Sequence, residues 1–389
     1  MKKIGLLISF GFFVSAFGQQ EVLVKLFSSY SIGQSWVTTH SGDYFLVGTD
    51  SEFNVIDTVD DLYEEDVLRT LLIKKAADKV EVFKGGKSFG AYDGLKLITS
   101  KKDAHFIIQG KGAERIYNGQ LLFRSYKDDF QVINQIALEP YVAGVVESEG
   151  GHVSDVEYFK AQAVLARTWV LKNMNKHSAD GYNVKDNVSS QAYYSKAYLQ
   201  NSEAILDAVA KTKDLVLLDS KGKLVFGAFH SNSGGQTSNS EDIWSQKIDY
   251  LRSVEDSYSL KGSKAEWEKK ISKAEFVEYF ARVLGVSKSD KAMQRAVLNI
   301  KMKQREPWFV YNGKKVKMRN VRTKFRLRSS FFSVSDLGEY VLLKGKGFGH
   351  GVGLSQQGAM EMAREGKSYQ EILLFYFKGT HLAPLNSDS

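Results

Sequence analysis

The sequence of 389 residues contains no cysteine. This absence excludes cysteine nucleophiles, iron–sulfur clusters, most structural zinc modules and lipid anchors attached through cysteine. The seven histidines include no pair spaced three or four residues apart, so a metal site would need ligands from distant segments. We therefore predict no metal site and no other cofactor.

The sequence also lacks an apolar run long enough for a membrane span. The apolar run at residues 4–14 is shorter than the roughly 20 residues that a spanning helix needs. Lys2 and Lys3 precede it, and small residues lead up to a cleavage position after Gly18. This pattern is typical of a secretory signal peptide, with a membrane anchor as the alternative. We predict that residues 1–18 are removed and that the protein is exported to the periplasm, cell wall or extracellular space, without a stable membrane span.

Acidic residues are fewer than basic ones. Lys and Arg number 53 against 45 Asp and Glu, a net charge of +8 that falls to +6 without Lys2 and Lys3. The hydrophobic content of 43% is that of a folded chain. Because an exported protein does not meet genomic nucleic acid, we predict no nucleic-acid partner and favour an anionic polymer such as the cell wall.

The chain changes character along its length. Short alternating segments bounded by Gly, Ser, Asp and Lys predict strands at residues 22–27, 44–47, 53–59, 80–83 and 104–109. Longer helical patterns follow between about 139 and 213, strands return near 215–230, and two helical signals follow Ser355. The fold class expected is α+β, with a mostly-β N-terminal region followed by a mixed α/β domain.

Residues 139–151 predict a helix whose last turn carries a candidate acid. Pro140 suits the first helical position, and Glu149 continues the apolar stripe of Val142, Val145 and Val146. A carboxyl on an apolar face is desolvated, which raises its pKa and favours proton donation near neutral pH. The alternative is an ordinary surface glutamate at a helix end.

The neighbours of Glu149 are expected to differ from it. Glu147 points about 160° away around the helix and is expected to face solvent. Gly150 and Gly151 are expected to end the helix directly after Glu149, leaving its carboxyl beside open backbone that a ligand could approach.

A second helix is expected from a capping box at Ser154–Glu157 to about Asn173. Lys160 and Arg167 fall on one face, with only small apolar residues between them. This face could receive an anionic or polyhydroxylated ligand or orient Glu149. The alternative is a solvated basic face.

Two later segments are candidate binding loops. Leu215–Leu218 and residues 224–229 predict a hairpin that ends at His230, followed by the polar loop 231–237. His230 beside Ser231 does not by itself make a catalytic triad, so His230 is expected to be a binding or structural residue. Residues 345–353 have glycine at every second position. They match no phosphate loop, and they predict close backbone approach in strand-like geometry before a helix capped by Ser355. Residues 368–371 form a capping box, so Ser368 is predicted to open the last helix.

Several of these segments together resemble one known family. Residues 134–149 (NQIALEPYVAGVVESE) and 160–169 (KAQAVLARTW) are similar to the opening motifs of the stage II sporulation protein D (SpoIID/LytB) family. Further colinear similarities are found at residues 191–193, 229–237, 250–254, 327–332, 345–357 and 379–380. The resemblance implies a domain at 117–384, with a less typical segment at about 257–320, and leaves a β-rich region at 19–116 without a role.

The resemblance implies activity on peptidoglycan. Enzymes of this family are lytic transglycosylases that cut between N-acetylmuramic acid and N-acetylglucosamine and leave 1,6-anhydro ends; other members enhance a cell-wall amidase. The position of the family's acid/base glutamate is Glu149. Substrate-binding residues implied by the matching segments are Lys160, Arg167, Gln191, His230, Ser231, Tyr250, His350, Ser355 and Gln356. The partners expected are peptidoglycan glycan strands and an amidase.

This chain departs from the family pattern at two places. Gly150-Gly151 stands where Met-Pro is usual, and Ser259 stands where an acid is usual. Some relatives hold zinc through cysteine and histidine, which the absence of cysteine argues against here.

A single acid is chemically sufficient for such a reaction. Ordinary glycosidases use two carboxyl groups. If the sugar's own 6-hydroxyl attacks the anomeric carbon, one carboxyl can protonate the leaving oxygen and then accept the hydroxyl proton.

Overall fold

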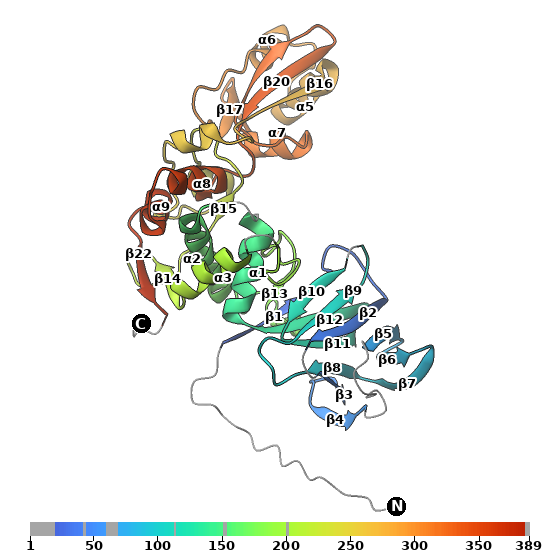
Figure 1. Cartoon of the computed structure of the whole chain (residues 1–389). Coiled ribbons are helices and arrows are strands. Elements are labelled where there is room, and N and C mark those ends of the chain that lie inside the picture. Colours follow the sequence, from blue (N-terminus) through green and yellow to red (C-terminus); the bar gives the residue numbers. More distant parts are fainter. Residues whose placement is uncertain are drawn as a thin grey trace, which may run out of the picture. The chain divides into compact units, whose positions relative to one another are not determined.

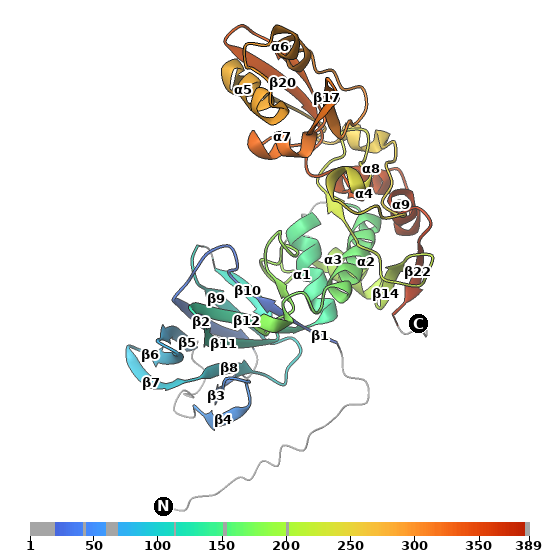
Figure 2. The same cartoon turned by 180° about the vertical axis from the view of Figure 1, so that it is seen from behind.

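The computed structural model describes residues 20–41, 44–59, 69–112, 114–150, 154–199 and 202–385 (Figures 1 and 2). The predicted signal peptide, residues 1–18, lies outside these ranges. The chain divides into two compact units, one made of residues up to Tyr141 with Ala179–Lys185, the other of Val142–Ser178 with the residues from Asp186 onward. The α+β class is confirmed, with the strands concentrated in the first unit.

The first unit is built from two mainly antiparallel sheets. One sheet has the order β13-β1-β12-β11-β8-β3-β4 and the other the order β10-β9-β2-β5-β6-β7. The strands of the first sheet are β1 (Glu21–Lys25), β3 (Phe45–Thr49), β4 (Val55–Thr58), β8 (Gly94–Ile98), β11 (Gln120–Tyr126), β12 (Asp129–Ala137) and β13 (Val184–Lys185). Those of the second are β2 (Gln34–Ser41), β5 (Arg69–Ala76), β6 (Lys79–Lys84), β7 (Lys87–Tyr92), β9 (His105–Gln109) and β10 (Arg115–Asn118).

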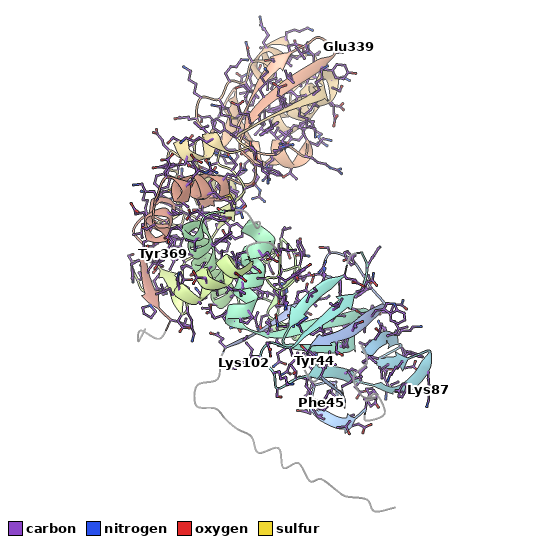
Figure 3. All side chains as sticks on the ribbon, viewed as in Figure 1. Tyr44, Phe45, Lys87, Lys102, Glu339 and Tyr369 are labelled. Carbon is purple, nitrogen blue, oxygen red and sulfur yellow. The ribbon has the colours of Figure 1, made fainter. Side chains whose placement is uncertain are left out.

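Alternation along the strands forms the core of this unit. In β1, Val22 and Val24 are fully buried and their neighbours are more exposed, which illustrates the period of two. Figure 3 labels buried Tyr44, which directly precedes β3, and exposed Phe45, which begins it. The five predicted strand segments are present with shifted bounds. The unit extends past residue 116, where the sequence placed its boundary, because β11 and β12 pair with β8 and β1 and complete the first sheet.

The second unit has a helical centre. Its helices are α1 (Leu138–Gly150), which begins in the first unit, α2 (Val156–Lys172), α3 (Ser202–Lys211), α4 (Ser240–Ile243), α8 (Gln356–Arg364) and α9 (Tyr369–Tyr376). Two short sheets join distant parts of the chain, β14 (Leu215–Leu218) with β22 (His381–Pro384) and β15 (Phe229–His230) with β21 (Leu354–Ser355). Most of α2 is buried, so it is the central helix of this unit.

Helices α1, α2, α8 and α9 lie where the sequence predicted them, with small changes at their first residues and caps. The α2 cap is Asp155, whose side chain accepts the Glu157 N–H, and not the predicted Ser154. Helix α1 begins at Leu138, two residues before Pro140, which still lies in the first turn where a missing N–H costs no hydrogen bond. Ser355 and Ser368 cap α8 and α9 as predicted.

The predicted hairpin is only partly formed. The Val225 N–H donates to the Leu217 carbonyl at 3.1 Å, as expected across a hairpin. The regular strand after the turn is nevertheless limited to Phe229–His230. This short strand pairs with β21 instead of with β14. The predicted partner was therefore wrong for the residues nearest the site.

Residues 266–346 form an inserted subdomain within the second unit. The sheet β16-β20-β19 (Glu266–Ser272, Tyr340–Lys346, Phe332–Asp336) packs with helices α5 (Lys273–Leu284), α6 (Lys291–Leu298) and α7 (Met318–Lys324) and the hairpin β17–β18 (Trp308–Tyr311, Lys314–Lys317). A continuous hydrophobic cluster that includes Phe276, Phe280 and Val341 fills its interior. None of the helices in the described ranges combines the length and apolar character needed to cross a membrane.

Candidate functional site

Glu149, at the end of α1, lines a pocket of about 590 Å³ in the second unit. The other walls come from the end of α2 and the residues after it, the loop after β13, the segment around β15, the residue after α4, the glycine-rich loop and the start of α8. They are Trp169, Asn173, Lys176, Val188, Ser189, Ser190, Phe226, Gly227, Ala228, Phe229, His230, Ser231, Trp244, His350 and Gln356. Among the described residues of this lining, Glu149 is the sole acid.

The Glu149 carboxyl is held in a largely dry environment. Burial raises its pKa above the ordinary glutamate value, and a hydrogen bond from the Ala192 N–H to Oε1 at 2.6 Å acts weakly in the opposite direction. The amide of Gln356 donates to the Glu149 carbonyl at 2.9 Å and fixes the helix end. The desolvation predicted from the apolar stripe is thus present.

Tyr158 lies beneath the end of α1. A Cβ on Gly150 would lie 3.0 Å from the Tyr158 hydroxyl oxygen. Glycine at this position therefore allows the end of α1 to pack directly against the Tyr158 ring. Burial raises the pKa of Tyr158, and the negative charge of Glu149 raises it further. The charge of Glu149 therefore adds to burial in keeping Tyr158 in its neutral form.

Glu147 corrects the sequence prediction, because it is buried and does not face solvent. Its carboxylate accepts the N–H groups of Tyr198, at 3.2 Å, and Leu199, at 3.0 Å. The hydroxyl of Ser148 likewise accepts the Tyr194 N–H at 3.1 Å. Residues 192–199 cover this side of α1, and their backbone donors need the acceptors that α1 supplies.

Lys160 and Arg167 do not line the pocket of Glu149. Lys160 pairs with Glu157 at 2.5 Å and lies 5.8 Å from the ring centre of Tyr369, which Figure 3 labels at the start of α9. Arg167 is fully buried and donates to the carbonyls of Leu215, at 3.0 Å, and Val209, at 3.5 Å. Trp169, two residues further and so about 200° around the helix, is the α2 side chain in the pocket.

Two neutral histidines and a tryptophan form one wall. The ring of His350 lies 5.5 Å from that of His230 and 5.3 Å from that of Trp244. Burial and the charge of Arg322 lower the pKa of His350 to about 4, and burial lowers that of His230 as well. The backbone N–H of Val352 donates to Nδ1 of His350 at 3.1 Å. The wall offers flat uncharged rings to a ligand.

The remaining predicted residues fall into two groups. Ser231 and Gln356 line the pocket, beside His230 and His350. Ser355 and Gln191 are fully buried and do not line it. The Ser355 hydroxyl caps α8 and also accepts the Ser233 N–H at 3.1 Å, which gives it a structural role in joining two segments.

The glycine-rich loop corrects another prediction. Gly347, Gly349, Gly351 and Gly353 all have positive φ, at 75°, 116°, 86° and 71°, so the geometry is not strand-like beyond β20. Close backbone approach is nevertheless present, because a Cβ on Gly353 would lie 2.1 Å from the Ala228 carbonyl oxygen. These glycines seat His350 against the β15 segment.

Sequence reasoning missed several residues that shape the site. Trp169, Asn173 and Trp244 line the pocket, although no local pattern distinguishes them from core or surface residues. Asp256 is buried and accepts the Ser233 hydroxyl at 2.7 Å and the Ser259 N–H at 3.2 Å. The position at which the family's acid is replaced by Ser259 therefore has a carboxylate beside it, three residues earlier.

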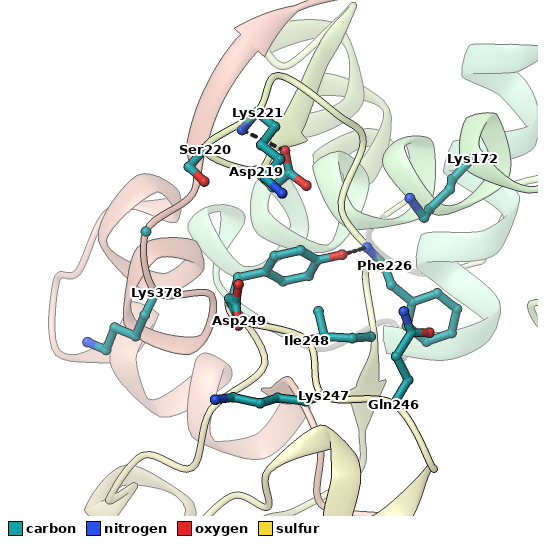
Figure 4. Close-up of a pocket in the computed structure, with 12 residues that line it drawn as sticks. Lys172, Asp219, Ser220, Lys221, Phe226, Gln246, Lys247, Ile248, Asp249 and Lys378 are labelled. Atoms are coloured by element: carbon teal, nitrogen blue, oxygen red, sulfur yellow. Dashed lines mark hydrogen bonds between the residues drawn. The ribbon is translucent and has the colours of Figure 1, made fainter.

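Tyr250 lies in a second pocket, of about 620 Å³, shown in Figure 4. Its hydroxyl accepts the N–H of Phe226 at 2.7 Å. Phe226 lines both pockets, so Tyr250 contacts the wall of the Glu149 pocket from behind. The described residues contain no group of three or more His, Asp or Glu side chains able to hold a metal ion.

Replacing Tyr250 by phenylalanine removes the acceptor of the Phe226 N–H. We expect Tyr250→Phe to lower the free energy of unfolding by about 1 kcal/mol. Urea denaturation followed by fluorescence measures this change. Unchanged stability would show that the Phe226 N–H finds another acceptor and that the tyrosine does not support the wall.

Comparison with known proteins finds one family that the chain resembles over most of its length. Residues 126–218 match the family model SpoIID, described as "Stage II sporulation protein". The chain is 33% identical to Stage II sporulation protein D of Bacillus subtilis, over 82% of this chain and 94% of that relative. It is 34% identical to the protein of the same name from Bacillus amyloliquefaciens, over 74% and 86%. It is also 27% identical to the "Amidase enhancer" of Bacillus subtilis, over 61% of this chain and 40% of that relative.

Proposed function

This chain belongs to the stage II sporulation protein D family, and from that premise we propose that it is an exported lytic transglycosylase of peptidoglycan. Its substrate is the glycan strand, cut between N-acetylmuramic acid and N-acetylglucosamine. Glu149 protonates the leaving oxygen and then takes the proton of the 6-hydroxyl that attacks the anomeric carbon. The product ends in a 1,6-anhydro sugar.

The observation that carries this proposal is the position of one desolvated acid in the lining of the Glu149 pocket. Burial keeps its pKa high, so the carboxyl can act as an acid before it acts as a base. A reaction in which water attacks would call for a second carboxyl group. Trp169, Trp244 and His350 supply flat faces on which sugar rings can stack.

A second candidate function is activation of a cell-wall amidase without catalysis. The similarity to a protein named "Amidase enhancer" favours it. On this alternative the Glu149 pocket would bind glycan or the amidase, and no glycosidic bond would be cut.

Product analysis separates the two functions. Purified glycan strands are incubated with the protein, and the products are identified by mass spectrometry. Fragments with 1,6-anhydro ends support the transglycosylase, and fragments with reducing ends show hydrolysis instead. If the protein alone releases nothing but accelerates a purified amidase on whole peptidoglycan, the activator function holds.

The raised pKa of Glu149 predicts the pH dependence of cleavage. Proton donation needs the neutral carboxyl, so the rate is retained on the acidic side and falls as pH rises through the Glu149 pKa, which lies above the ordinary glutamate value. The pH profile of kcat/KM measures this limb. If kcat/KM instead falls at the ordinary glutamate pKa, burial does not raise the pKa of Glu149.

A further inference from the structure

The positive charge of the protein is concentrated in the inserted subdomain. Residues 266–346 contain twenty Lys and Arg against eight Asp and Glu, a net charge of +12, whereas the rest of the chain carries −4. Cations gathered in this way repel one another and lower the stability of the folded subdomain. A basic surface of this kind lowers the energy of an anionic ligand bound beside it, which gives the charge a function.

Part of this charge borders the Glu149 pocket. Residues 319–328 contain five cations and no acid. The guanidinium of Arg319 donates to the Ile243 carbonyl at 2.6 Å, directly before the pocket residue Trp244. The charge of Arg322 lowers the pKa of His350, which lines the pocket.

Two cations flank the ring of Phe348 in the glycine-rich loop, and a third lies close to it in the sequence. Lys264 lies 5.5 Å and Arg328 5.7 Å from the centre of the Phe348 ring, which is 37% exposed. The Gly349 N–H donates to the Arg328 carbonyl at 2.9 Å, one residue before His350. Lys346 is exposed at the end of β20, two residues before Phe348.

These five cations, Lys264, Arg319, Arg322, Arg328 and Lys346, are named the basic rim. Within the described part of the chain, none of them has a carboxylate at ion-pair distance. Four of the five side chains are exposed, all but that of Arg322, so their charge is available to a ligand. Burial, not a nearby cation, dominates the pKa of Glu149, so the rim acts on the ligand and not on the acid.

We infer that the basic rim binds carboxylates carried by the glycan strand beside the pocket of Glu149. This inference rests on the proposed function and adds to it a preference for acidic over neutral glycans. Exposed arginines and lysines bind carboxylates, and Phe348 between Lys264 and Arg328 gives a sugar ring a face to stack on. The carboxylates come either from the lactyl group of muramic acid or from attached stem peptides.

The test measures binding, in a Glu149→Gln background so that the strands stay intact. The rim variant is Lys264→Gln with Arg328→Gln and Lys346→Gln. The matched control is Lys288→Gln with Lys291→Gln and Arg295→Gln, which removes the same charge at and near α6. Figures 1 and 2 show α6 and α7 at opposite ends of the inserted subdomain.

We expect the rim variant to bind acidic strands about tenfold more weakly at low salt, and the control variant to bind them like the parent. Neutral chitin oligosaccharides should bind all three proteins alike. Salt should weaken the parent more steeply than the rim variant. In active protein, the rim substitutions should raise KM and leave the pH profile unchanged.

Separate arms identify the source of the carboxylate. Peptide-free strands retain the lactyl carboxylates, and strands with stem peptides carry the peptide carboxylates. A loss seen with peptide-free strands assigns the lactyl group, and a loss confined to peptide-bearing strands assigns the peptide. Equal binding of acidic strands by the rim and control variants would overturn the inference. A wild-type protein that releases no 1,6-anhydro products would instead refute the proposed function and leave the binding result standing.

Discussion

Glu149→Gln is expected to reduce the release of 1,6-anhydro products by roughly 10³-fold, the scale of a lost general acid and base. The amide keeps the shape of the side chain and can still accept the Ala192 N–H, but it can neither donate the proton to the leaving oxygen nor take one from the 6-hydroxyl. Quantitative mass spectrometry of digested glycan strands measures the loss. Undiminished release by this variant would remove Glu149 from the proposed mechanism.

Stability distinguishes lost chemistry from lost folding in this variant. Because the folded-state pKa of Glu149 is raised, its contribution to stability is present below the unfolded pKa and is lost as pH rises through the folded pKa. Near neutral pH the glutamine variant should therefore unfold at the same temperature as the wild type or higher. Glu147→Gln is the neighbouring control, because Glu147 binds backbone N–H groups outside the pocket and its folded variant should keep cleaving.

Arg167→Ala is expected to lower the free energy of unfolding by about 3–5 kcal/mol. The guanidinium is fully buried in α2 and donates to the carbonyls of Leu215 and Val209. Alanine leaves a cavity and removes the donor from these carbonyls. Urea denaturation measures the change, and the smaller Lys160→Ala loss, at most about 1 kcal/mol for a partly exposed pair, is the matched comparison.

The alternative outcome for Arg167 is equally specific. If Arg167→Ala is as stable as Lys160→Ala but binds glycan strands weakly, the arginine reaches the ligand through a rearrangement of α2. The expected result is the reverse, with activity lost in proportion to the unfolded fraction. Residual cleavage per folded molecule should then match the wild type.

The sequence predicted those parts of the site that depend on local geometry. The position of Glu149 on an apolar stripe follows from the helical period, and the caps at Ser355 and Ser368 follow from short hydrogen bonds within one turn. The family likeness was visible in the order of the motifs and agrees with the relatives found. The helical period and the two caps each lie within about a dozen residues of sequence.

Other features depended on contacts between segments far apart in the chain. Glu147 was expected to face solvent, yet residues 192–199 cover it and donate to its carboxylate. Lys160 and Arg167 share a face of α2, but the opposite face carries Trp169 into the pocket. Helical periodicity tells which residues share a face, and it does not tell which face meets the ligand.

By itself, the sequence determined the elements around Glu149 and the family, because helix period and capping are written in neighbouring residues and the family motifs follow one another in order along the chain. Only the tertiary structure decided what each polar side chain does. A buried arginine or glutamate is stable only where another segment supplies its hydrogen-bond partners, and those partners come from 42 to 52 residues away for Arg167 and Glu147.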